Sequence, residues 1–261
     1  MYINFQKEFE LDLDELHDPI ILIGWPGIGL VGKIALTAIR DSIDAKLFLT
    51  IQYSDFPPKS SVENGKLEIP TAKVHYAKRE SQDLFILTAD YQPKSSEGVF
   101  EFSRKFCEKL DELTTGKIKM YISMGAMVSE DNEQSLIHIS GTDENIVNSF
   151  LEFENTKIME KGVVAGANGI LPAWAGNNGY APGICLLSET MPLQMINLDP
   201  NASKNLVALL KKYLNIDMDY SELDKKVEEM EDMIDKFKQK QNSFIKPPSP
   251  QKKDKSDSYF R

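Results

Sequence analysis

The chain has 261 residues, of which 41% are apolar and 27% charged, enough for one large domain with an appendage or for two small domains. Its net charge of −10 argues against nucleic acid as the main partner, because phosphate binding needs a basic surface. It has no apolar run of the roughly 20 residues that a membrane helix needs, no signal-peptide pattern and no metal-ligand spacing. We therefore expect a cytoplasmic protein without membrane, nucleic-acid or metal partners.

Short apolar runs alternate with segments of helical periodicity over most of the chain. In chain order they predict a strand at 20–23, a helix at 30–39, strands at 46–53, 67–69, 73–78 and 84–89, a helix at 95–113, strands at 118–124 and 136–139, a helix at 144–153, strands at 162–165 and 184–187, and a helix at 201–214. Asp199 is placed to cap the last helix, just before Pro200. This alternation predicts an α/β domain over residues 1–215, with a mainly parallel sheet covered on both faces.

An amphipathic helix is predicted next, over residues 216–242. Its apolar residues follow one another at intervals of 4, 3, 4 and 3, which gives a seam two heptads long: Leu223, Val227, Met230, Ile234 and Phe237. Two heptads are too short for a free-standing coiled coil, so the seam must be covered by a partner helix or by the chain's own domain. We expect a homo-oligomer, with folding back onto the domain as the alternative.

The last segment, residues 243–261, is rich in proline, serine and lysine and is predicted to be disordered. It holds five Lys or Arg residues and two Asp, so its side-chain charge is +3 and the rest of the chain carries −13. An acidic body with a basic tail indicates that the tail has a task of its own. The tail ends in two aromatic residues and an arginine: Tyr259, Phe260 and Arg261.

A glycine-rich turn follows the first predicted strand and contains Gly24, Gly27, Gly29 and Gly32. Residues 27–32 match the dinucleotide motif G-x-G-x-x-G, but the acidic residue expected after the second strand appears only as Asp55 in the next loop. Residues 27–33 also match most of a phosphate loop, but Ile34 stands where Ser or Thr would hold magnesium. We favour a structural turn. The alternative is a nucleotide-binding protein or an ATP-dependent enzyme that uses residues 24–33.

Other candidate chemistry is sparse. The three histidines lie far apart in the sequence, and neither cysteine has a recognisable catalytic context. We therefore expect no catalytic residues, no cofactor and no enzyme activity. The uncharged segment 166–179 is rich in glycine, asparagine and small residues, and is predicted to be a loop. Two interpretations of this loop remain open: the wall of a ligand pocket and a contact between subunits.

Several blocks of the sequence together resemble the proteasome assembly chaperone 2 family in its archaeal form, sometimes labelled an ATP-grasp relative. The resemblance rests on the glycine turn at 24–32 and on Asp55-Phe56-Pro57-Pro58, followed by softer matches at 166–171, 183–190 and 199–210. It covers residues 20–214, which is nearly the whole predicted domain. It implies a three-layer α/β/α sandwich similar to nucleoside phosphorylases but without their active site.

The resemblance also implies a function. Members of the family act as chaperones or binding factors for the 20S proteasome, and archaeal members form homo-oligomers. The end of the chain resembles the hydrophobic-Tyr-any motif with which proteasome activators dock between subunits of the α ring. Tyr259 would take the hydrophobic position and Arg261 would supply the carboxylate, whereas Phe260 stands where the motif has tyrosine. This resemblance predicts docking of the tail on the α ring.

Overall fold

The computed structural model describes residues 1–129, 136–190, 198–217, 221 and 223–225. Its strands are β1 (Ile3–Lys7), β2 (Ile20–Gly24), β3 (Lys46–Tyr53), β4 (Ser61–Glu63), β5 (Lys66–Glu68), β6 (Thr71–Ala77), β7 (Leu84–Ala89), β8 (Met120–Val128), β9 (Ile137–Gly141), β10 (Thr156–Ile158) and β11 (Gly183–Thr190). Its helices are α1 (Val31–Ser42), α2 (Ser96–Thr114), α3 (Glu144–Leu151), α4 (Ala167–Asn177) and α5 (Pro200–Tyr213), with a short 3₁₀ helix, η1 (Ile28–Leu30), before α1. In this part of the chain, no helix is long and apolar enough to cross a bilayer.

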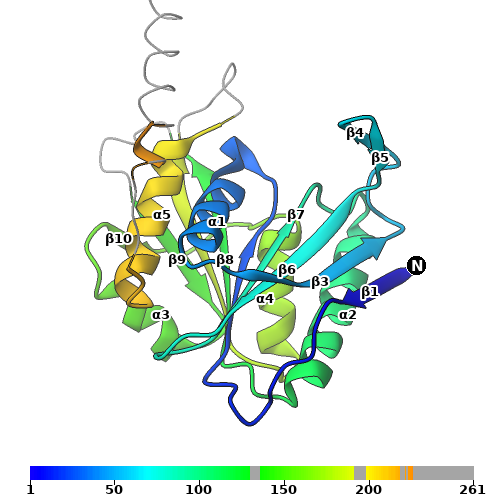
Figure 1. The fold of residues 1–261 in the computed structure, drawn as a ribbon. Helices are drawn as coiled ribbons and strands as arrows, with labels where there is room; N and C mark the ends of the chain where they lie inside the picture. Colours follow the sequence, from blue (N-terminus) through cyan, green and yellow to red (C-terminus); the bar gives the residue numbers. More distant parts are fainter. Residues whose placement is uncertain (130–135, 191–197, 218–220, 222, 226–261) are drawn as a thin grey trace, which may run out of the picture.

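The main sheet has its strands in the order β1-β3-β6-β7-β2-β8-β11-β9-β10, and β4 and β5 form a separate hairpin (Figure 1). The four central strands, β7, β2, β8 and β11, are parallel to one another. Antiparallel pairs extend the sheet on one side through β6, β3 and β1. On the other side β9 runs antiparallel to β11. The predicted α/β architecture is confirmed, and its parallel character lies in the centre of the sheet.

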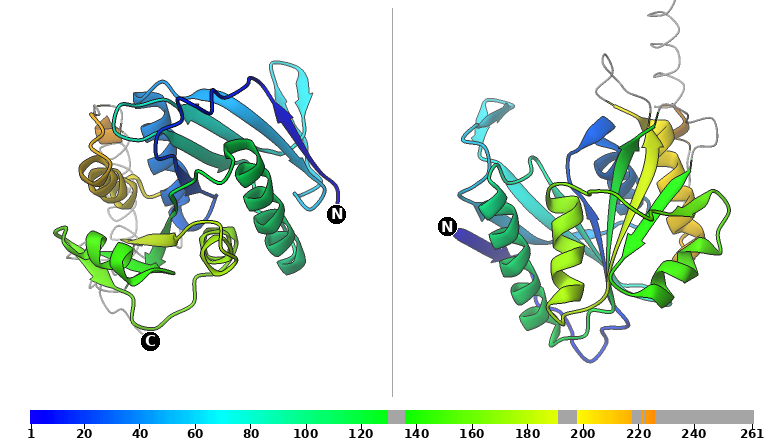
Figure 2. Two further views of the ribbon diagram at one scale, coloured as in Figure 1. Left: turned by 90° about the horizontal axis from the view of Figure 1, so that it is seen from below. Right: turned by 180° about the vertical axis from the view of Figure 1, so that it is seen from behind.

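Helices cover both faces of the sheet: α1, α3 and α5 lie on one face and α2 and α4 on the other (Figure 2). Strand β2 is buried along its whole length because its side chains alternate between the two layers. Leu22 belongs to the core under α1 and α5, whereas Ile21 and Ile23 belong to the core under α2 and α4. The continuous apolar run at 20–23 therefore indicates a strand that helices cover on both faces of the sheet.

The termini of the helices follow the local sequence. Helix α2 begins after Ser95, whose hydroxyl accepts a hydrogen bond from the Gly98 N–H at 2.9 Å. Helix α5 begins after Asp199, whose carboxylate accepts one from the Ala202 N–H at 2.9 Å. The predicted cap at Asp199 is therefore confirmed.

Two predictions between residues 162 and 179 are wrong. Residues 162–165 form no strand, and Val163 there is 88% exposed. The edge position beside β9 is taken instead by β10, so the apolar run at 162–165 has no strand to pair with. Residues 166–179 are mostly helix α4 rather than a loop, even though Pro172 lies inside the helix.

Helix α4 tolerates Pro172 because the carbonyl that loses its helical partner finds another donor. Proline has no N–H, so the carbonyl of Asn168, four residues earlier, has no helical hydrogen bond from residue 172. The thiol of Cys185 on β11 donates to this carbonyl at 3.7 Å. Burial raises the pKa of Cys185 to about 12, which keeps the donating proton on the sulfur.

Candidate functional site

The glycine turn between β2 and α1 allows unusually close packing of backbone on backbone. A Cβ added to Gly32 would lie 2.2 Å from the carbonyl oxygen of Met124 on β8, and one added to Gly24 would lie 2.5 Å from the carbonyl oxygen of Gly32. Gly29 and Leu30 both take the left-handed conformation, with φ of 59° and 49°. Glycine is thus required in this turn so that α1 can rest directly on β2 and β8.

Polar side chains from distant segments already bind the backbone of this turn. The side-chain oxygen of Asn168, at the start of α4, accepts a hydrogen bond from the Trp25 N–H at 3.2 Å. Gln92 donates to the carbonyl of Pro26 at 2.7 Å and, through its oxygen, accepts from the Ala167 N–H at 2.9 Å. Asn168 and Gln92 therefore hold the turn against α4, and sequence periodicity gave no sign of either role.

Asp199 closes the turn from the side of α5. Its N–H donates to the carbonyl of Gly29 at 2.8 Å, and its carboxylate also accepts from the Thr190 hydroxyl at 2.5 Å. A Cβ on Gly29 would lie 3.0 Å from the Cβ of Asp199. A buried carboxylate beside a helix N-terminus disfavours a phosphate there, because two negative charges would share one desolvated site.

The second sequence block, Asp55-Phe56-Pro57-Pro58, anchors helix α2 and extends the aromatic core. The Asp55 carboxylate accepts a hydrogen bond from the Ser95 N–H at 2.9 Å. The rings of Trp25 and Phe102 meet edge to face, with centroids 4.9 Å apart, and Phe56 packs beside both. Both blocks thus form one packed region at the carboxyl ends of the central strands.

Tyr53 lies in the same region. Its hydroxyl donates to the carbonyl of Gly98 at 3.0 Å. Burial, and then the nearby Asp55 carboxylate, raise the pKa of Tyr53 to about 12. Within the described residues, no group of three or more His, Cys, Asp or Glu side chains is placed to hold a metal ion.

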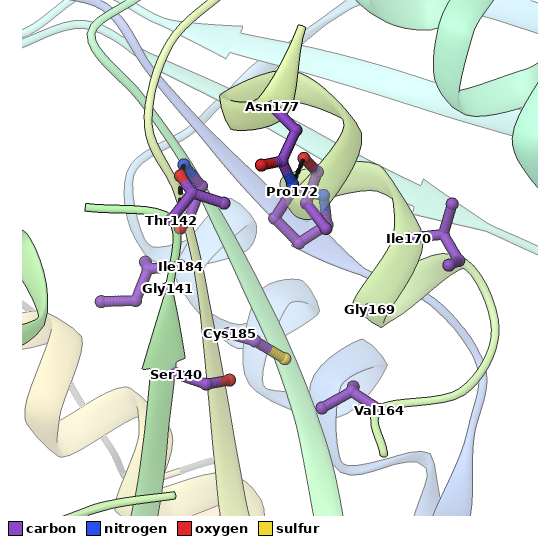
Figure 3. Close-up of a pocket in the computed structure, with 12 residues that line it drawn as sticks. Ser140, Gly141, Thr142, Val164, Gly169, Ile170, Pro172, Asn177, Ile184 and Cys185 are labelled. Carbon is purple, nitrogen blue, oxygen red and sulfur yellow. Dashed lines mark hydrogen bonds between the residues drawn. The ribbon is translucent and has the colours of Figure 1, made fainter. Parts of the chain in front are cut away.

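A groove of about 350 Å³ lies at the opposite end of the strands, between α4 and the strands β9 and β11 (Figure 3). Ser140 and Thr142 border it on the β9 side, Val164 and Pro172 on the α4 side, and Cys185 lies between them. Cys185 is the only titratable residue among the twelve that line the groove, and its raised pKa leaves it a protonated thiol. The groove therefore offers apolar surface, the Ser140 and Thr142 hydroxyls and a protonated thiol.

The predicted seam and tail fall largely outside the described residues. Leu223 is described: it is 4% exposed and packs in the core under α1 and α5 together with Leu214 and Ile216. Outside the described part lie the rest of the seam and the end of the tail, namely Val227, Met230, Ile234, Phe237, Tyr259, Phe260 and Arg261.

The sheet, with helices on both faces, makes this a three-layer α/β/α domain. The glycine turn, its three polar supports and the aromatic cluster pack together at the carboxyl ends of its central strands. A family model matches residues 21–238, and the chain belongs to the PAC2 family. Among its relatives, protein MJ1210 of Methanocaldococcus jannaschii is 29% identical, over 91% of this chain and 92% of that protein.

Solved structures show the same fold. The crystal structure of Pyrococcus furiosus PbaB, described as an archaeal proteasome activator, matches with a TM-score of 0.81 and 26% identity, over 90% of this chain and 98% of that one. Pyrococcus furiosus PbaA, described as an archaeal homolog of proteasome-assembly chaperone, matches with a TM-score of 0.70 and 22% identity, over 92% of this chain and 93% of that one.

Proposed function

We propose that this protein is a non-enzymatic cytoplasmic factor that binds the 20S proteasome, either as an assembly chaperone or as an activator-like protein. The observation that carries the proposal is the similarity to PbaB along almost the full length of both chains. PAC2 family membership and the fold shared with PbaA point the same way. The packed glycine turn supports the non-enzymatic part, because its backbone groups already bind Asn168, Gln92 and Asp199.

The alternative function is a nucleotide-binding protein that uses residues 24–33. Isothermal titration calorimetry of the purified chain with ATP and with NAD distinguishes this alternative from the proposed proteasome-binding function. We expect no binding at micromolar nucleotide. Micromolar binding that is lost in Gly29→Ala, in a variant that remains folded, would establish the alternative.

For the docking element we propose the C-terminal tail, with Tyr259, Phe260 and the carboxylate of Arg261 entering a pocket between α subunits. The composition of residues 243–261 predicts a disordered chain, and the twenty residues from Asn242 to Arg261 reach about 65–70 Å when fully extended. A tail of this length reaches a neighbouring ring from the edge of an oligomer. Its charge of +3 favours an acidic docking surface, so binding should weaken with added salt.

One tail binds weakly, because ordering a disordered segment opposes binding. Several tails on one oligomer bind together, since each later contact is intramolecular and experiences a high effective concentration. We propose that the chain forms a homo-oligomer and that the seam residues Val227, Met230, Ile234 and Phe237 contribute to it. Leu223 is already buried in its own domain and has no part in that contact.

Truncation tests the docking element. A chain that ends at residue 258 should lose co-purification with the 20S particle but keep its circular dichroism spectrum and its particle mass. A matched control deletes residues 247–249, which shortens the tail by the same length and leaves the last three residues in place. If the chain ending at 258 binds as tightly as the full chain, the docking contact lies on the globular surface.

A further inference from the structure

A hollow of about 440 Å³ lies where β3 ends, between the first residues of the chain and the base of the β4–β5 hairpin. Seven of the eleven residues that line it are aromatic, proline or isoleucine, among them Tyr2, Phe56 and Ile69. Lys59 is the one charged residue of the eleven, and its ammonium lies 5.9 Å from the centre of the Tyr91 ring. We call this surface the aromatic hollow. Its lining favours an uncharged ligand.

The aromatic hollow has a fixed shape. Its floor is formed by Tyr53 and Phe56, each 5% exposed, whose rings meet edge to face with centroids 5.7 Å apart. At the rim, the N–H of Tyr2 donates to the Ser54 hydroxyl at 3.0 Å, and the carbonyl of Tyr2 accepts from the Ser54 N–H at 3.0 Å. Tyr2 is nevertheless 60% exposed. Because the floor is packed and the rim is held by backbone hydrogen bonds, a ligand can bind without reorganising the site.

Aromatic and proline side chains around a hollow are typical of sites that bind polyproline II segments. A polyproline II helix makes no internal hydrogen bonds, so its prolines pack on rings while its carbonyls remain free to accept. Gln52 and Ser60 also line the aromatic hollow, and an amide or a hydroxyl can donate to such a carbonyl. The chemistry of the lining therefore points to a proline-rich segment as the ligand.

The chain itself carries a segment of this kind in its tail, beyond the described residues. Residues 247–250 read Pro-Pro-Ser-Pro and contain three of the thirteen prolines of the chain. They match the pattern P-x-x-P, which predicts polyproline II structure. With three residues per turn, Pro247 and Pro250 lie on the same face of such a helix. The segment carries no charge, as the lining of the hollow requires.

The described part of the chain ends on the same side of the domain as the aromatic hollow. Asp224, one residue before the end of the described part, is hydrogen-bonded to Lys204 in the first turns of α5. Helix α5 begins beside the end of β11, where Asp199 binds Thr190. Strand β3 ends at the same edge of the sheet as β11, because β6 is antiparallel to both β3 and β7. Figure 1 shows the hairpin and the start of α5 at this common end.

The intervening segment has the right length to reach the aromatic hollow. Strands β11 and β3 are five positions apart in the sheet, which corresponds to about 24 Å at a strand spacing of about 4.8 Å. Residues 226–245 span about 25 Å on average as a flexible coil and about 30 Å as a helix. A tethered segment within reach has an effective concentration on the order of millimolar. The chain's own tail is therefore favoured over a free proline-rich partner at micromolar concentration.

We propose that residues 247–250 bind in the aromatic hollow of the same molecule as a polyproline II segment, with Pro247 and Pro250 packed on the rings of Tyr2 and Phe56. The eleven residues 251–261 stay free and reach about 36–40 Å when extended. The tail is thus fixed to the domain at one point, and only its last part moves independently. This inference does not depend on binding of the proteasome.

Photocrosslinking of the full chain tests the contact. Benzoylphenylalanine replaces Gln251, which follows the proline segment directly, and the protein is mixed with an isotope-labelled copy before irradiation. We expect crosslinks to residues 52–60 and 69–70 within one molecule. Crosslinks only to other surfaces would overturn the proposal. Crosslinks to the aromatic hollow that join only differently labelled molecules would overturn it too, because a second copy's tail would then be the ligand.

Matched variants separate the two sides of the contact. Pro250→Ala should lose most of the crosslink yield, whereas Pro248→Ala, the same change on another face of the segment, should keep it. On the domain, Tyr2→Ala should lose the yield and Phe100→Ala, at an aromatic residue on α2 that is 48% exposed, should keep it. Circular dichroism confirms that each variant is folded. Equal yields in Pro250→Ala and Pro248→Ala would overturn the proposal.

Salt and truncation distinguish this contact from other ways of holding the tail. An uncharged contact should give the same crosslink yield in low and in high salt. A yield that collapses with salt would show that the basic tail merely rests on the acidic domain, and would overturn the inference. So would a yield that is lost when the chain ends at residue 258, because the terminal aromatic residues would then fill the hollow. All these yields are measured on the isolated protein, so a negative result leaves the proposed proteasome binding untouched.

Discussion

Gly32 lies where helix α1 meets strand β8, and its missing side chain sets how closely the two pack. In Gly32→Ala the new Cβ would lie 2.2 Å from the Met124 carbonyl oxygen, a backbone atom that cannot rotate away. The helix must then shift, and we expect unfolding free energy to fall by about 1–3 kcal/mol. Urea denaturation followed by circular dichroism measures the loss.

The control for this substitution lies in the same turn. A Cβ on Gly27 would meet nothing closer than 3.7 Å, and the φ of Gly27 is −156°, which any residue adopts. Gly27→Ala should therefore change stability by less than about 0.5 kcal/mol. Equal losses in the two variants would contradict the close-packing role of Gly32.

His75 on β6 gives the stability of the protein a pH dependence. Burial, and then the nearby positive charges of Arg40 and Lys73, lower the pKa of His75 from 6.5 to about 4. Between pH 6.5 and 4 the unfolded chain therefore binds a proton at this site that the folded chain does not, so unfolding free energy falls as the pH falls. We expect His75→Phe to lose less stability than the wild type between pH 7 and pH 5 in urea denaturation, with His17→Phe as the exposed control. An unchanged pH dependence in His75→Phe would count against this account.

Helix α5 depends on its N-cap residue, Asp199, more than an ordinary capped helix does. Asp199 caps α5, binds the Thr190 hydroxyl and donates through its N–H to Gly29. Asp199→Ala leaves the buried Thr190 hydroxyl without this acceptor as well as removing the cap, so we expect a loss of about 2–4 kcal/mol. Asp143→Ala is the matched control, since Asp143 caps α3 through one hydrogen bond to the Ile146 N–H and should cost about 1 kcal/mol. Thermal denaturation compares the two variants, and equal losses would show that the hydrogen bond from the Thr190 hydroxyl to the Asp199 carboxylate contributes nothing to stability.

The sequence predicted elements well where periodicity and burial agree. Strand β2 and helix α2 have clear patterns, and both form within a few residues of their predicted ends. Helix α4 was missed because glycine, proline and asparagine normally interrupt helices, and its stability depends on contacts with a distant strand, such as the Cys185 thiol on the Asn168 carbonyl.

Short edge elements escaped prediction for a different reason. Strands β1, β4 and β10 have three to five residues each, so alternation has little length in which to appear, and their side chains are mostly exposed. The residues of the candidate site were likewise predictable only where they leave a local pattern in the sequence. The glycines were visible as a motif, whereas Asn168 and Gln92 act through single long-range hydrogen bonds that leave no local pattern.

At the scale of the whole molecule, a substitution in the tail should strengthen the proposed docking on the 20S particle, just as truncation should abolish it. In Phe260→Tyr the ring remains and a hydroxyl is added at the position where the docking motif has tyrosine. One hydrogen bond contributes about 0.5–1.5 kcal/mol, so we expect the affinity for the 20S particle to rise by about 2- to 12-fold per tail. Surface plasmon resonance at fixed salt measures this, and Phe260→Leu, which loses the ring, should bind more weakly than the wild type. Equal affinity of all three chains would exclude a specific pocket for residue 260.

The order of strands in the sheet also bears on how the protein is made. Strand β2 leaves the ribosome well before both of its neighbours, β7 and β8, which begin only at Leu84 and Met120. At roughly 5–20 residues per second, a fully apolar strand waits on the order of 5–20 s for its second neighbour. Helix α5, which covers one face of the sheet together with α1, is synthesised later still. During translation, a nascent chain of this protein therefore exposes strand β2 to other molecules. At that stage the strand can be shielded only by factors at the ribosome, because the rest of the domain has not yet been made.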